Sequence, residues 1–446
     1  MWLISNVTLI LFASITFQSL SIFIIGNLFL ALGNLLINIG AKCENKIQYS
    51  HIFNLCFFVY LLYAVVCYFY MGWLDYKTLL VSDSITAYIP YTERFIKMNS
   101  FSEMWNTIYN NSITGKYAHT GIILIYFAMV GKIAYLFDNE LFFNLQISLL
   151  FLSSFISVFV YKLLHDNEIK NSYRWTLIYS FLSINFYYST LILRDTPIAL
   201  LYLIVFCHIF NRYSLKNLCI IVLCVLVIWG IRPQNGLFIL LYLLTPFIKD
   251  RFEIKETIFV ITIVLLIGFI FFKLEGMDMY EQNQTGFYNR LQIADSTSML
   301  NKFNLLPPII SHAVKVIYIL LSPIPCWSFM AIGTSANELN NLLGFPRAIG
   351  TYYNYIILGF ILFGLRTFFK SDILQKYKYS LLISLLFIAL QSNSTELRRI
   401  MLCFPILLLY STIVIDNMPP KTSHRVIEYM TLIFVIAQII GMTKYL

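Results

Sequence analysis

The chain has 446 residues, of which 59% are hydrophobic and only 12% are charged, and its formal net charge is +9. A soluble domain carries about a quarter charged residues, so this composition excludes a soluble globular protein and predicts an integral membrane protein. The basic residues fall mainly in short loops, which is typical of membrane orientation rather than of nucleic-acid binding.

Long apolar stretches recur along the chain and are continuous rather than alternating, which favours membrane-spanning helices over a barrel. The first 39 residues lack the basic region and the cleavage site of a signal peptide, so we expect them to stay as one or two helices. Further spans are predicted at about 51–71, 141–161, 175–192, 197–210, 218–229, 236–248, 256–272, 349–366, 379–391, 399–416 and 426–443. The expected fold is an all-α polytopic bundle of about 12–13 transmembrane helices, forming a single domain over 1–446.

Basic residues between the predicted spans assign one side of the membrane to the cytoplasm. They are Lys42 and Lys46, Lys162, Lys170 and Arg174, Arg212 and Lys216, Lys249, Arg251 and Lys255, Arg366, Lys370, Lys376 and Lys378, and Lys421 and Arg425. This assignment holds only if the apolar segment 119–137 does not cross, so we expect it to lie on, or dip into, the outer surface. Lys132 within it suits an interfacial segment.

The outer face then carries two large loops, 72–140 and 273–348, with interfacial or re-entrant helices. The prolines of 306–335 favour a broken or re-entrant helix there. Three tight outer turns are expected at 193–196, 230–235 and 392–398. Because most connections on the other face are short and basic, the site of function is expected on this outer face.

Polar residues that suit a binding site gather in these turns and at the start of the first loop. They are Asp83, Tyr88, Arg94, Arg194, Asp195, Arg232, Gln234, Glu396, Arg398 and Arg399. Ionisable groups at the ends of apolar helices usually face a cavity or a partner. Guanidinium groups match phosphate geometry, and a carboxylate can take the proton from an attacking hydroxyl. The pattern predicts an enzyme that acts on a lipid-linked anionic substrate.

In this hypothesis Asp83 is the general base, and Asp195 orients Arg194 or the acceptor. Arg194, Arg232, Arg398 and Arg399 bind phosphate, and Tyr88, Arg94, Gln234 and Glu396 contact substrate. Structural alternatives stay open for each motif. Asp83 can cap a helix, Arg194 and Asp195 can form an ion pair before a helix that starts at Pro197, and the two late arginines can be interfacial anchors.

The order of these features resembles the GT-C class of membrane glycosyltransferases, in particular the branch of protein O-mannosyltransferases and the aminoarabinose transferase of lipid A. Asp83-Ser84 followed by Tyr88 resembles the acidic motif of the first outer loop. The surface segment 119–137, a span, a basic loop and a hairpin with Asp195 at its tip follow in the family's order. Ser84 replaces the second carboxylate of that motif.

Later segments continue the resemblance. The turn 231–236 is similar to an outer turn that carries a basic residue and glycine, and Arg398 and Arg399 before Pro405 are similar to a late arginine-bearing helix. The chain is also similar to divergent repeat-unit polymerases of O-antigen and capsule assembly. The resemblance implies a polyprenyl (undecaprenyl) phosphate- or diphosphate-linked sugar donor used on the extracytoplasmic face of the inner membrane.

The functional expectation is a multi-pass glycosyltransferase of polysaccharide assembly, either a repeat-unit polymerase or a single-sugar GT-C enzyme. Its partners would be the lipid-linked glycan donor and acceptor, the bilayer, and a chain-length regulator or other glycan-assembly proteins, with no nucleic acid. Eight cysteines stand singly and the histidines do not cluster, so no metal or other cofactor is expected, although a divalent metal stays open. The alternatives are a flippase of lipid-linked oligosaccharides or another transporter, and a scaffold without catalysis.

Overall fold

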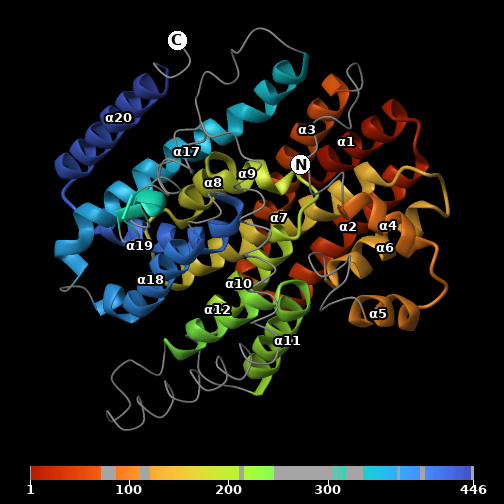
Figure 1. Ribbon diagram of the computed structural model, residues 1–446, viewed down its shortest axis with the longest axis horizontal. Coiled ribbons are helices and arrows are strands. Elements are labelled where there is room, and N and C mark those ends of the chain that lie inside the picture. Colours follow the sequence, from red (N-terminus) through yellow and green to blue (C-terminus); the bar gives the residue numbers. More distant parts are fainter. Residues whose placement is uncertain are drawn as a thin grey trace.

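The computed structural model describes residues 2–71, 87–110, 121–209, 215–245, 306–307, 310–311, 314–317, 335–368, 372–391 and 397–442. Every regular element in these ranges is a helix, which confirms the all-α class. Figure 1 shows the bundle they form. In chain order the helices are α1 (Trp2–Thr16), α2 (Leu20–Gly40), the short 3-10 helix η1 (Cys43–Asn45), α3 (Lys46–Met71), α4 (Ile89–Ile96), α5 (Phe101–Asn110), α6 (Ile123–Ala134), α7 (Phe142–Asp166), α8 (Ser172–Leu182), α9 (Ile184–Ser189), α10 (Asp195–Ile209), α11 (Leu215–Ile231), α12 (Pro233–Leu244), α17 (Ser335–Phe368), α18 (Asp372–Gln391), the 3-10 helix η7 (Leu397–Cys403), α19 (Phe404–Asp416) and α20 (Pro420–Met442).

Three of the described helical segments are long and apolar enough to cross a membrane: Leu20–Gly40, Cys43–Cys67 and Phe142–Asp166. Shorter apolar helices complete the bundle: α10 packs against α7, and α11 packs against α10. Large apolar side chains such as Ile15, Leu35, Leu226 and Leu432 are more than half exposed. So much exposed apolar surface is unusual in a soluble monomer. The protein is therefore a membrane protein, while the count of 12–13 spans stays a prediction.

One end of the bundle gathers basic residues that are far apart in sequence. The backbone N–H of Lys170 donates to Asp416 at 3.0 Å and joins the α7–α8 loop to the end of α19. The Tyr377 hydroxyl of α18 donates to Asn167 in the same loop at 2.5 Å. We call this the basic end, because the helix ends that meet here carry Lys46, Lys162, Lys170, Arg174, Lys378 and Lys421.

The opposite end holds the turns in which the sequence places the candidate residues, and we call it the site end. The Gln146 amide near the start of α7 donates to the carbonyl of Thr190, just after α9. The N–H of Ile122, just before α6, donates to the carbonyl of Gly230 in the last turn of α11 at 3.0 Å. Turns from α6, α7, α9 and α11 therefore meet at one end.

The far end of α6 returns to the same end of the bundle. Asp138, four residues after α6, accepts hydrogen bonds from the Ser19 hydroxyl and from the N–H and hydroxyl of Ser21, in the α1–α2 connection. The Asn144 amide of α7 donates to the Ser21 hydroxyl as well. α6 therefore both begins and ends at the site end, while the expectation that 119–137 does not cross the membrane stays a prediction.

Two helix boundaries differ from those expected. The predicted span 175–192 is broken at Ser183, whose backbone is extended and whose hydroxyl accepts the N–H of Asn185 at 3.2 Å, so α8 and α9 are separate. A serine can compete with helical hydrogen bonds in this way. α17 begins at Ser335 and contains Pro346, so the last part of the predicted loop 273–348 is helical. Most of 306–335 lies outside the described residues.

Candidate functional site

Two helix starts at the site end bring a carboxylate and a guanidinium together. α10 begins at Asp195, while Arg232 stands in extended conformation between α11 and α12, where Pro233 begins the next helix. An Arg232 Nη1 lies 3.7 Å from Asp195 Oδ1. Asp195 is 4% exposed and Arg232 is 9% exposed. An ion pair this deeply buried costs much desolvation free energy and is weak evidence for a stabilising role by itself.

Arg194 adds a second guanidinium beside this pair. It is half-buried, and its Nη1 lies 3.5 Å from the carbonyl oxygen of Ile231, at the limit of a hydrogen bond. The sequence expectation paired Asp195 with Arg194. The role given to Asp195 in the sequence hypothesis was to orient Arg194 or the acceptor, and that role stays a prediction; the ion pair that the structure shows for this carboxylate is with Arg232. The three side chains together carry two positive charges and one negative charge, which leaves an excess of one positive charge.

A third segment forms a wall of this site. η7, which contains the backbone of Arg398 and Arg399, packs against both α10 and α9. These two arginines are therefore in an element that borders the helix of Asp195. Gln234 lies in the first turn of α12, two residues after Arg232. The side chains of Gln234, Arg398 and Arg399 lie outside the described residues, as do Asp83 and Glu396 entirely.

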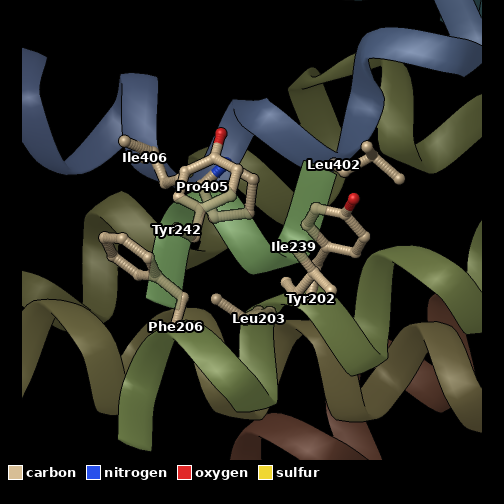
Figure 2. Close-up of a pocket in the computed structure, with 8 residues that line it drawn as sticks. All are labelled: Tyr202, Leu203, Phe206, Ile239, Tyr242, Leu402, Pro405 and Ile406. Carbon is tan, nitrogen blue, oxygen red and sulfur yellow. The ribbon is translucent and has the colours of Figure 1, made fainter. Parts of the chain in front are cut away.

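A narrow cavity opens between α10, α12 and the η7–α19 segment (Figure 2). Tyr202, about two turns along α10 from Asp195, donates its hydroxyl to the carbonyl of Asn235, three residues after Arg232. The Tyr242 hydroxyl pairs with Ser384 at 2.7 Å. The cavity is mainly aromatic and aliphatic, being lined by Tyr202, Leu203, Phe206, Ile239, Tyr242, Leu402, Pro405 and Ile406.

Besides Asn144, whose side-chain oxygen is also unpaired, three buried amide side chains at the site end carry atoms without hydrogen-bond partners. They are Asn185 in α9, with both its nitrogen and its oxygen unpaired, Gln146 in α7 and Asn235 in α12, each with an unpaired oxygen. Sequence reasoning missed all three. The available signal was an amide residue inside an otherwise apolar helix, where its side chain must find a polar partner or stay unsatisfied.

The remaining predicted residues lie on α4, which packs mainly against α6. Tyr88, directly before α4, is 4% exposed and meets Phe127 of α6 edge to face, with ring centroids 6.0 Å apart. Arg94 is exposed in the last turn of α4. α6 itself begins beside Gly230, so α6 links α4 to the turn that holds Arg232. The structure thus gathers Arg194, Asp195 and Arg232, and it places Tyr88 and Arg94 on a neighbouring layer.

No three His, Cys, Asp or Glu side chains group as metal ligands within the part of the chain that the structure describes. The chemistry on view is therefore that of guanidinium groups, a carboxylate, amides and tyrosines. This set suits the binding of an anionic group together with neutral polar groups. Comparison of the chain with protein-family models, with curated proteins and with solved structures finds no match.

Proposed function

We propose that this protein is a glycosyltransferase that uses a polyprenyl phosphate- or diphosphate-linked sugar at the site end, on the extracytoplasmic face of the inner membrane. It would act in O-antigen or capsular polysaccharide assembly, as a repeat-unit polymerase or as a GT-C sugar transferase. The observation that carries the proposal is the buried Asp195–Arg232 pair with Arg194 beside it.

The charge balance of this group supports an anionic ligand. Arg194 and Arg232 outnumber Asp195, and both guanidinium groups stay charged at any physiological pH. The structure also holds Arg232 at the start of a helix, where Pro233 fixes the backbone. A phosphate bound here would gain charge-assisted hydrogen bonds in a site shielded from water, where they are stronger than on a surface.

The same groups would assist transfer of the sugar. As the bond between the sugar and the phosphate breaks, negative charge grows on the phosphate, and fixed guanidinium groups stabilise it. Asp195 would hold Arg232 in position rather than take a proton. Asp83 remains the proposed general base for the attacking hydroxyl.

The test is glycan extension in a strain that lacks the gene and is complemented with variants. Arg232→Ala and Asp195→Ala should each abolish extension while the protein still inserts in the membrane. Arg174→Ala, an exposed arginine at the basic end, is the matched control and should extend glycan normally. Full-length polymer in both site variants would overturn the proposal.

The same strain separates this proposal from the flippase alternative. Loss of a polymerase or of a transferase leaves unextended lipid-linked units on the outer leaflet, because delivery across the membrane is intact. Loss of a flippase leaves those units on the cytoplasmic leaflet. Accumulation inside would therefore favour transport, and an unchanged glycan would favour a scaffold.

A further inference from the structure

Buried amides with unpaired atoms lie on α7, α9 and α12, and both α7 and α12 pack against α10, the helix that begins at Asp195. Asn185 is 0% exposed, and neither its side-chain nitrogen nor its side-chain oxygen has a partner. Gln146 is 7% exposed and Asn235 is 2% exposed, and each has an unpaired side-chain oxygen. Leaving such a group unsatisfied inside a protein is costly, so a partner is expected to fill it during function.

The hydrogen bonds and the sequence place these amides near the ion pair. The Gln146 nitrogen donates to Thr190, five residues before Asp195. Asn185 lies in α9, whose last turn meets α10 where the Thr196 hydroxyl contacts the carbonyl of Tyr188 at 3.5 Å.

Asn235 stands in the first turn of α12, and its N–H donates to the carbonyl of Arg232 at 3.0 Å. α7, α9 and α12 therefore each contribute one amide on an element that these contacts link to Arg232 or to the segment leading into Asp195.

The unpaired atoms define the ligand chemistry. Three carbonyl oxygens need hydrogen-bond donors, and the Asn185 nitrogen needs an acceptor. Ionised phosphate offers only acceptors, so it cannot satisfy the oxygens. A hydroxyl group both donates and accepts. None of the three amides is ionisable, so the ligand group they fit is neutral.

We propose that Asn185, Gln146 and Asn235 form a hydroxyl-binding subsite that holds the sugar of the lipid-linked donor. This inference rests on the proposed function, in which Arg194 and Arg232 hold the phosphate of the same donor. The sugar would satisfy the amides that the empty protein leaves unpaired. Because that satisfaction requires correctly placed hydroxyls, this subsite would select among sugars. Bound water offers the same hydroxyl chemistry, and the experiment separates the two sources.

The experiment measures binding by the purified full-length protein in lipid nanodiscs. The probes are bare undecaprenyl phosphate and undecaprenyl phosphate carrying each of a panel of hexoses. At least one sugar-bearing lipid should bind about fivefold or more tightly than the bare lipid, since a hydrogen bond contributes roughly a 2- to 10-fold gain. Asn185→Leu should remove that gain, leave bare-lipid affinity unchanged and keep or raise the thermal unfolding midpoint.

Asn6→Leu is the matched control. Asn6 also has an unpaired oxygen, yet its nitrogen donates to Asn54 in the half of α3 nearer the basic end, so its loss should leave the sugar-dependent gain intact. If Asn185→Leu does not fold, Gln146→Met and Asn185→Ser supply the same comparison.

Two results would overturn the subsite: no hexose improves affinity, or Asn185→Leu retains the gain. If Asn185→Leu retains the gain and also loses stability, the partner of Asn185 is structural water. If instead the proposed function is wrong, Arg232→Ala should leave the affinity for bare undecaprenyl phosphate unchanged. That result differs from those that would overturn only the subsite.

Discussion

Removing Arg232 should destabilise the protein, because it would leave the carboxylate of Asp195 buried without its cation. Asp195 is 4% exposed, and the guanidinium nitrogen lies 3.7 Å from its oxygen. At that separation and an effective dielectric constant of about 20, the attraction is about 4.5 kcal/mol. Breaking one partner of a buried pair typically costs about 3–5 kcal/mol. We therefore expect Arg232→Met to lower the free energy of unfolding by about 3–5 kcal/mol.

A double-mutant cycle isolates the electrostatic part of this loss. In the Asp195→Asn, Arg232→Met protein the carboxylate charge is gone, so most of the lost stability should return. The assay is reversible unfolding of the purified variants in mixed micelles, followed by far-ultraviolet circular dichroism. The reasoning is refuted if Arg232→Met unfolds like wild type, or if the two single losses simply add in the double variant.

Other features of the site end give further predictions. Burial alone would raise the pKa of Asp138. Hydrogen bonds from Ser21, Glu140 and Ser19 outweigh this effect and lower the pKa below its usual value. A lowered pKa means that the carboxylate stabilises the fold above the unfolded-state pKa and that this contribution is lost as pH falls through the folded-state pKa. Asp138→Asn should thus lower the thermal midpoint at pH 7 and lose that deficit in acid; a deficit that grows in acid would contradict the assignment. Gly121 has φ +61°, and a Cβ there would stand 2.3 Å from the Gly230 carbonyl oxygen, so Gly121→Ala should cost more than about 1 kcal/mol in the same unfolding assay, whereas a neutral result would mean that α6 does not depend on this contact.

The sequence predicted that two turns would meet, because the two predicted crossings between them, 197–210 and 218–229, return the chain to the side on which it started. With a consistent basic side, 193–196 and 230–235 therefore lie at the same end. From Lys132 and the parity of the basic loops, it also predicted that 119–137 lies on, or dips into, the outer surface, and this stays a prediction. The partner of Asp195 could not be predicted, because adjacency in sequence favoured Arg194 while the helix start at Asp195 faces Arg232 instead.

The helix break and the unpaired amides depend on tertiary contacts that no local pattern encodes. Ser183 interrupts an apolar stretch that reads as one span, and α17 crosses at that point so closely that a Cβ on Gly350 would lie 2.7 Å from the backbone of Ile184. Whether Asn185 or Gln146 finds a partner is decided by which helices pack beside it. These features therefore appear only when the bundle is assembled.

The most direct test of the central claim is the affinity of wild type and Arg232→Ala for bare undecaprenyl phosphate in nanodiscs. Charge-assisted hydrogen bonds contribute about 1.5–3 kcal/mol, so the variant should bind at least about tenfold more weakly, while Arg174→Ala binds like wild type. Equal affinity of wild type and Arg232→Ala would contradict the assignment of this buried cation to a lipid-linked phosphate.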